Sequence, residues 1–263
     1  MMYWLYMILI VVVMLLSAGV RAQGDTVRPG KGGLLTRNLK PGTRQYLVTY
    51  LDPAKNRQLG FWYWVREIGT GNRNGSPVFF IDQRWYGSDT PAYRTVYSIN
   101  EAASFAPVYH QEQVRGKLNA YNWRWDGISG ADTVADNARK GFSLAFSEPN
   151  FNWNLDIETF EMLPLAVGRS FLINFYDAGL SPPQYVRYTV KGSEKLAMGG
   201  GDVDCWVLTT EGKDPGGTAY TESYWISKKE HEFLKEVDHF NGMIRYKILM
   251  PALTPDVRMG FTR

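Results

Sequence analysis

The chain has 263 residues, and its 29 lysines and arginines are nearly balanced by 26 aspartates and glutamates, which leaves a formal net charge of +3. So small an excess excludes the strongly basic surface that binds nucleic acid or adheres to an anionic membrane. The single cysteine, Cys205, excludes an internal disulfide, and a chain of this length can bury a core without one.

An uncharged apolar segment opens the chain. Residues 1–20 carry no charged side chain, and the run Leu5–Leu16 is wholly apolar or aromatic. This run is shorter than the roughly 20 residues of a membrane-spanning helix and is typical of a signal peptide. Small residues indicate cleavage between Ala22 and Gln23. Residues 1–22 are therefore predicted to be a signal peptide, and the mature protein is predicted to be periplasmic or secreted.

The same segment has a second interpretation. No lysine or arginine precedes the apolar run, whereas Arg21 follows it, and signal peptides usually carry positive charge at their start. Without cleavage, residues 4–20 would anchor the protein in the inner membrane. A membrane is expected as a partner only in this uncleaved form. Attachment through a lipid is not expected, because a lipoprotein needs a cysteine at the cleavage site and Cys205 lies far from it.

The remaining chain is predicted to form one domain. Residues 23–44 are rich in Gly, Arg, Lys and Pro, which is typical of a flexible lead-in. A single β-rich domain is expected over residues 45–250, with a C-terminal tail over residues 251–263.

Runs typical of strands follow one another at short intervals within this domain. They are rich in aromatic and β-branched residues, and Gly, Pro, Asn and Asp separate them. This pattern predicts a mainly β fold, either an antiparallel sheet, a sandwich or a barrel. The predicted strands are Tyr46–Leu51, Leu59–Ile68, Val78–Tyr86, Tyr93–Ile99, Ala106–Val114, Leu118–Trp125, Ser170–Tyr176, Tyr185–Lys191, Val203–Thr210, Ala219–Ser227, Glu232–Phe240 and Met243–Met250.

One short helix is predicted over residues 154–163. Asn154 is expected to cap it, and Pro164 is expected to stop it. Asp156 and Glu158 suit the positive end of the helix dipole. An approximate apolar stripe is formed by Leu155, Thr159, Phe160, Met162 and Leu163.

The last two strands are predicted to form a hairpin around Asn241-Gly242. Both central positions of a two-residue turn of this type need a positive φ, which Asn and Gly tolerate. The resulting register pairs Phe240 with Met243. It also places two oppositely charged pairs on one face, Asp238 with Arg245 and Glu236 with Lys247.

The other face of this hairpin is mainly apolar and is expected to point toward the core or a cavity. It carries Phe233 and Met250 together with six candidate groove-lining residues, which are Lys235, Val237, His239, Ile244, Tyr246 and Ile248. Lys235 and His239 are the polar members of this set. They are expected to reach the sheet edge and solvent, or else to line a wet cavity.

No catalytic or metal-binding signature stands out. The three histidines, His110, His231 and His239, lack the helical spacing of a zinc protease and are expected to be solvated. There is no Gly-x-Ser-x-Gly elbow and no phosphate-binding glycine loop, because Gly199–Gly201 is typical of a hairpin turn. No catalytic residue, metal or cofactor is therefore predicted, and Cys205 is expected to be a buried strand thiol.

One pair of carboxylates keeps an enzymatic alternative open. Asp202 and Asp204 lie two positions apart on a predicted strand and so share a face. Two carboxyl groups that converge in an open cleft can act on glycosidic bonds. The aromatic clusters can stack on sugars or fill the core.

Five short motifs resemble a known family. They are Glu161–Gly168, Tyr188–Glu194, Asp204–Leu208, Tyr224–Ser227 and Leu234–Val237. Over residues 45–250 the chain resembles the bacterial family called domain of unknown function 3108, whose members are exported. The resemblance implies a strongly curved antiparallel sheet, a half-barrel or open barrel similar to periplasmic lipoprotein carriers, with a helix against its concave side. It implies no catalytic residues.

The fold class expected from these observations is mainly β, a curved antiparallel sheet with one short helix around residues 154–163. An apolar groove on the concave face would bind a lipid, another apolar ligand or an envelope protein partner. The leading hypothesis is therefore a non-catalytic exported envelope protein. The alternatives are a glycan-acting enzyme that uses paired carboxylates and a structural factor in envelope assembly.

Overall fold

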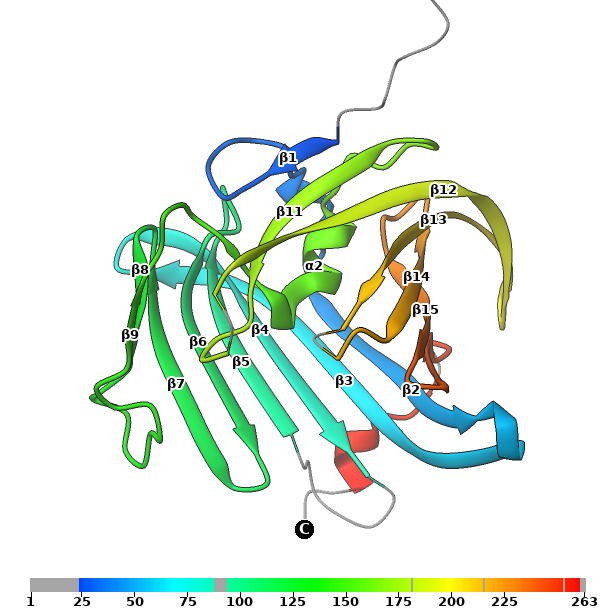
Figure 1. The fold of residues 1–263 in the computed structure, drawn as a ribbon, viewed down its shortest axis with the longest axis horizontal. Helices are drawn as coiled ribbons and strands as arrows, with labels where there is room; N and C mark the ends of the chain where they lie inside the picture. Colours follow the sequence, from blue (N-terminus) through cyan, green and yellow to red (C-terminus); the bar gives the residue numbers. More distant parts are fainter. Residues whose placement is uncertain (1–23, 88–93, 181, 215, 253, 261–263) are drawn as a thin grey trace, which may run out of the picture.

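The computed structural model describes residues 24–87, 94–180, 182–214, 216–252 and 254–260. The described strands join edge to edge into one large curved sheet that is not closed into a barrel, and a short helix lies inside its curve (Figure 1). The predicted fold class is confirmed. The predicted signal peptide, its cleavage site and the alternative anchor over residues 4–20 lie outside the described residues.

The described elements follow one another almost without interruption by helix. The strands are β1 (Asp25–Val27), β2 (Gly42–Asp52), β3 (Arg57–Arg73), β4 (Ser76–Tyr86), β5 (Arg94–Glu101), β6 (Pro107–Val114), β7 (Lys117–Arg124), β8 (Gly127–Gly130), β9 (Ser143–Ala145), β10 (Phe151–Asn152), β11 (Ser170–Tyr176), β12 (Gln184–Met198), β13 (Gly201–Lys213), β14 (Ala219–Ser227), β15 (Phe233–Phe240) and β16 (Met243–Leu249). The α-helix is α2 (Asp156–Glu161), and the 3₁₀ turns are η1 (Thr36–Asn38), η2 (Pro53–Lys55), η3 (Trp153–Leu155) and η4 (Val257–Gly260). None of these described helices has the length and apolar character needed to cross a membrane.

The sheet order brings the two halves of the chain together. It runs β1-β11-β12-β13-β14-β15-β16-β2-β3-β4-β5-β6-β7-β8-β9, and β10 pairs with β11. From β2 to β9 and from β11 to β16, strands that follow one another in sequence pair antiparallel, as short turns require. The pairing of β16 with β2 joins the end of the domain to its beginning, and β1 pairs with β11 in parallel.

The predicted strands are present, but the shortest strands of the structure were not predicted. β11 and β14 have the predicted limits. β1, β8, β9 and β10 have two to four residues each, too few to display an alternating pattern. The expected flexible lead-in over residues 23–44 needs correction, since Val27 of β1 is fully buried against the core.

The final hairpin has the predicted register. Asp238 lies opposite Arg245, and Glu236 lies opposite Lys247. The φ angles at Asn241 and Gly242 are +49° and +71°, so both turn residues adopt the left-handed conformation that this connection demands.

The expectation about which face of this hairpin points inward is wrong. Glu236 and Asp238 are buried, and Ile248 is 37% exposed. The cause is a β-bulge, because Trp225 and Ile226 of β14 pair with Lys235 and Phe233 and leave Leu234 as an extra residue. A bulge interrupts the alternation of side chains. Phe233 therefore shares the inner face with Glu236 and Asp238 rather than with Lys235.

The helix α2 fills the concave side of the sheet. It is preceded by η3, and its N-cap is Leu155 without a side-chain cap, so the predicted capping role of Asn154 is not realised. The predicted stripe is buried, but Ile157, Glu158 and Glu161 are buried as well. Every residue of the helix except the half-buried Asp156 is therefore enclosed, and its aromatic and aliphatic side chains belong to the main core.

A second, smaller core lies where the two ends of the sheet approach each other. Tyr176 of β11 packs against Trp123 of β7, with ring centroids 5.6 Å apart. Ile128 and Phe146 complete this cluster. Side chains rather than backbone hydrogen bonds thus connect the two ends of the curved sheet.

Candidate functional site

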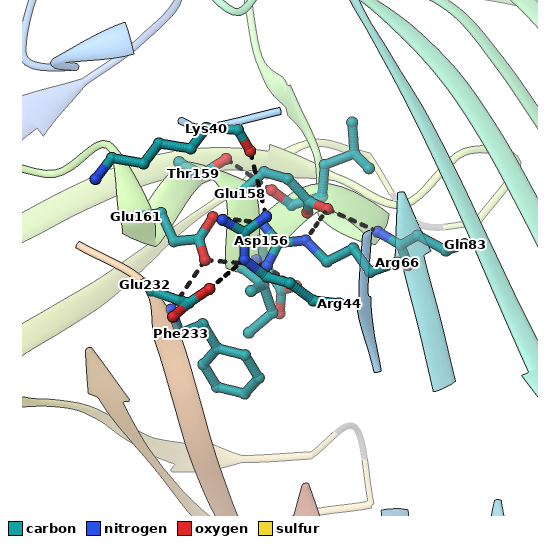
Figure 2. A network of polar contacts seen from close by, with 12 residues as sticks. Lys40, Arg44, Arg66, Gln83, Asp156, Glu158, Thr159, Glu161, Glu232 and Phe233 are labelled. Carbon is teal, nitrogen blue, oxygen red and sulfur yellow. Dashed lines mark hydrogen bonds and ion pairs between the residues drawn. The ribbon is translucent and has the colours of Figure 1, made fainter. Parts of the chain in front are cut away.

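A buried ionic cluster fastens α2 to the sheet (Figure 2). Arg66 projects from the middle of β3 and has no exposed surface. Its Nε donates to Glu158 over 2.8 Å, and its Nη1 donates to Glu161 over 3.0 Å. Gln83 of β4 also donates to Glu158, over 3.1 Å, and the backbone N–H of Phe233 donates to Glu161 over 2.9 Å. Three strands are therefore tied to one short helix.

This cluster holds two carboxylates against one guanidinium. Burial raises the pKa of Glu158, although the neighbouring Arg66 opposes the shift. The Glu158 Oε2 atom has no hydrogen-bond partner among the described residues. Because the cluster is closed to solvent on every side, we interpret it as a structural lock rather than as a binding site.

Two hollows share Trp153, the first residue of η3, and the first of them also borders the first turn of α2. We call the part of the sheet around these two hollows its mouth. The first hollow, of about 220 Å³, is lined by Trp64, Gln83, Trp85, Arg94, Trp153, Asn154, Asp156, Ile157, Asp177, Arg245 and Lys247. The second hollow, of about 490 Å³, is lined by Trp153, Gln184, Lys213, Asp214, Thr218, Ala219, Tyr220, Glu222, Phe240 and Asn241. Both combine aromatic rings with charged and amide side chains.

A ladder of rings and cations forms one wall of the first hollow. Trp64 and Trp85 stack with centroids 5.6 Å apart. The Lys247 Nζ lies 5.5 Å from the centre of the Trp64 ring, and the Arg94 Cζ lies 4.6 Å from that of Trp85. Such cation–π contacts hold long basic side chains in place.

The cations of this wall are already paired with carboxylates. Arg94 donates to Glu112 over 2.7 Å. Arg245 and Lys247 donate to the buried Glu236 over 2.9 Å and 2.6 Å. These two cations lower the pKa of Glu236 in spite of its burial. Burial and the nearby Glu236 charge raise the pKa of Asp238, although Arg245 opposes the shift.

Four further carboxyls, those of Asp156, Asp177, Asp214 and Glu222, line the hollows without an ion pair among the described residues. Burial raises the pKa of Asp156 to about 7, with Lys247 opposing the shift. Burial likewise raises the pKa of Asp177 and of Glu222. Asp156 accepts the N–H of Ile157 over 2.7 Å, Asp177 accepts from Asn154 over 3.3 Å, and Glu222 accepts from Tyr224 over 2.7 Å. Burial therefore shifts the pKa of Asp156, Asp177 and Glu222 in the same direction, toward the protonated form.

The six predicted groove residues lie on the outer face of the sheet, opposite α2. Lys235, Val237, Ile244 and Tyr246 are half-buried, while His239 and Ile248 are exposed. The Lys235 Nζ lies 4.6 Å from the centre of the Trp225 ring on this face. The bulge at Leu234 places them outside, and their binding role stays a prediction.

The remaining candidate residues divide between surface and core. Asp202 and Asp204 are exposed on the projecting hairpin of β12 and β13, and neither lines the two hollows, so the cleft that a glycosidase needs is not formed by this pair. Cys205 is buried as expected, and burial raises the pKa of its thiol to about 11.

The expectation that all three histidines are solvated is wrong for His110. Its side chain is fully enclosed, and burial lowers its pKa to about 3, so the ring is neutral. Asn152 donates to its Nδ1 over 2.9 Å. The alternation along β6 places His110 inside, next to Tyr121 and Trp123.

The residues of the two hollows were only partly foreseen. The tryptophans were visible in the sequence as aromatic clusters, and Arg245 and Lys247 as members of charged pairs. Their convergence with Asp156 was not visible, because β3, β4, β16 and the segment before α2 are far apart in the chain.

The structure is therefore that of a curved-sheet protein with a central helix and two hollows beside that helix. The chain belongs to the family of proteins of unknown function DUF3108, whose family model matches residues 45–249. None of the curated proteins compared with the chain matches it significantly in sequence.

Several solved structures are similar in arrangement. A β-barrel-like protein of the domain of unknown function DUF1849 from Brucella abortus has 12% identity and a TM-score of 0.48, with 81% of this chain and 96% of that chain covered. A protein described as exported, with a YmcC-like fold, from Bacteroides fragilis has 9% identity and a TM-score of 0.34, with 80% and 94% covered. The lipoprotein LppX from Mycobacterium tuberculosis has 9% identity and a TM-score of 0.26, with 81% and 90% covered. Since all three TM-scores lie below 0.5, the function proposed below rests on the geometry of this chain.

Proposed function

We propose that this chain is an exported, non-catalytic binding protein that holds a small polar ligand in the two hollows at the mouth of its sheet. The observation that carries the proposal is the polar lining of the two hollows that share Trp153, next to the start of α2. Small-molecule sites typically combine aromatic walls with a few convergent polar groups.

The filled interior argues for a polar ligand over the apolar or lipid ligand suggested by the sequence. Phe160 of α2 packs between Tyr188 and Tyr224, with centroids 4.6 Å and 4.8 Å from its own. A lipid chain would have to displace such close-packed rings. A small polar molecule needs only the hollows that already exist.

Export is supported by the leading segment of the sequence. Its uncharged apolar run and the small residues before Ala22 favour cleavage and release into the periplasm or the medium. Mass spectrometry of the mature N-terminus tests this. A chain that begins at Gln23 is expected, and retention of residues 4–20 would favour the membrane-anchored alternative.

Native mass spectrometry tests the binding function. Wild-type protein incubated with an aqueous envelope extract is expected to show the added mass of a bound molecule. After release from the protein, this molecule is expected to partition into water. The Trp153→Ala variant is expected to lose that mass, because Trp153 borders both hollows. The control Trp125→Ala removes an indole that is 45% exposed at the end of β7 and is expected to keep the mass. A bound species that partitions into chloroform, or no added mass at all, would contradict the proposal.

A protein partner on the outer face is a second candidate. Ile248, one of the six residues predicted from sequence, is 37% exposed there, and Phe61, in the same cross-strand row as Tyr246, is 36% exposed. A photo-crosslinking residue placed at Ile248 is expected to capture one envelope protein. Equal labelling from Lys117, on the distant strand β7, would indicate collisions without specificity.

A further inference from the structure

We infer that the ligand of the two hollows is a neutral oligosaccharide. This inference rests on the proposed function and names the ligand class for the same site. Its first support is the mixture of charges. Arg94, Arg245 and Lys247 line the first hollow together with Asp156 and Asp177, so a ligand of either strong charge would meet repulsion as well as attraction.

Hydroxyl groups match this mixture, because each one both donates and accepts a hydrogen bond. Asp156, Asp177 and Glu222 offer acceptor oxygens to the hollows. The amide side chains of Gln83 and Asn154 add groups that donate and accept. A ligand with many hydroxyls can satisfy these groups without a net charge of its own.

Trp64 supplies an independent indication of a missing acceptor. Its side chain is 98% buried and borders the first hollow, yet its indole Nε1–H has no hydrogen-bond partner among the described residues. A buried donor without a partner is costly. A ligand oxygen in the first hollow would provide the acceptor.

Aromatic rings at the junction and in the second hollow complete the match. Trp153 borders both hollows, and Tyr220 and Phe240 border the second. The C–H faces of sugar rings are apolar and pack on aromatic side chains, while their hydroxyl edges remain free for polar groups. A chain of several sugar units would extend past Trp153 and occupy both hollows.

Isothermal titration calorimetry at pH 7 tests the inference. The probes are neutral tetrasaccharides of glucose, mannose and N-acetylglucosamine, in α and β linkage. At least one is expected to bind with a stoichiometry of one. The variants Trp153→Ala and Tyr220→Ala are expected to weaken that probe at least tenfold, and Trp125→Ala is expected to leave it unchanged.

Two readouts keep the outcomes distinct. If no tetrasaccharide binds while the wild type still takes up a water-soluble mass from the extract, the oligosaccharide is overturned and the binding function stands. If neither binds, both fail. Thermal melting confirms that each variant is folded, and Tyr220→Ala serves where Trp153→Ala does not fold. Cleavage of a bound tetrasaccharide, seen by mass spectrometry, would overturn the non-catalytic assignment.

Discussion

At the scale of single residues, Arg66 is the side chain whose loss should damage the fold most. It neutralises carboxylates on α2 from the middle of β3, and neither Arg66 nor Glu158 has any exposed surface. Removing one partner of a buried ion pair leaves an uncompensated charge, which is more costly than the pair itself is stabilising.

Replacement of Arg66 by Met is therefore expected to lower the free energy of unfolding by about 3–5 kcal/mol. Urea denaturation followed by tryptophan fluorescence measures the change. The matched variant Glu158→Gln keeps an oxygen that accepts from Arg66 and removes one of two negative charges. It is expected to cost less than about 1 kcal/mol. Equal losses in the two variants would contradict this account.

Asp156 makes stability depend on pH in a direction that can be stated. Its pKa is raised to about 7 in the folded protein, so the folded state binds more protons than the unfolded state between about pH 4 and 7. Stability from this residue is highest at low pH and falls as the pH rises through that window.

The variant Asp156→Asn is thus expected to be more stable than wild type at pH 8, by no more than about 4 kcal/mol. The difference should vanish near pH 4. Denaturation at several pH values measures it, with the exposed Asp202→Asn as a control that leaves the profile unchanged. A difference that is the same at all pH values would show that Asp156 is not the titrating group.

At the scale of elements, the last hairpin depends on its turn and on its bulge. The turn sets the register through positive φ angles, and the bulge at Leu234 decides which face is buried. The turn and the bulge lie in one hairpin but control different properties. The pairing register of the two strands can therefore be predicted correctly while the buried face is predicted wrongly.

The turn can be tested by Gly242→Ala. A residue with a Cβ atom is strained at a φ of +71°, so this change is expected to destabilise the protein by about 1–2 kcal/mol. Gly69→Ala in β3 is the control, because a Cβ atom there meets nothing within 4 Å. Chemical denaturation should show little or no loss for the control, and a comparable loss in both variants would refute the role of the turn.

At the scale of the whole molecule, the short helix α2 takes the place of a second layer, because it covers the concave face of the curved sheet. Six residues of α2 are stable only because the sheet surrounds them, since an isolated helix of this length is not. The side chains of α2 therefore belong to one packed core with those of the surrounding strands.

Truncation of Phe160 tests this arrangement. Phe160→Ala is expected to lower the free energy of unfolding by about 3–5 kcal/mol. The truncation leaves a cavity that the helix and the surrounding strands cannot close. Phe61→Ala on the outer face, at a ring that is 36% exposed, is expected to cost less than about 1 kcal/mol. Thermal and urea unfolding of the two variants compare them, and similar losses would mean that α2 is not central to the core.

The agreement between sequence and structure follows the range of the interactions. Strands such as Ser170–Tyr176 and the turn at Asn241-Gly242 depend on neighbours in the chain, and both were predicted correctly. The helix position near residues 154–163 was also predicted, because Pro164 and the apolar spacing are local signals. The enclosure of His110 and Glu158 was not, because distant strands bury them.

The sequence alone determined the mainly β fold class, the limits of β11 and β14, the final hairpin register and the membership of the family suggested by its motifs. The tertiary structure decided which face of that hairpin is inside and where polar groups converge. The physical reason is that a bulge such as the one at Leu234 is set by pairing with β14. Likewise, Trp153, Asp156 and Lys247 meet only after the sheet has curved around α2.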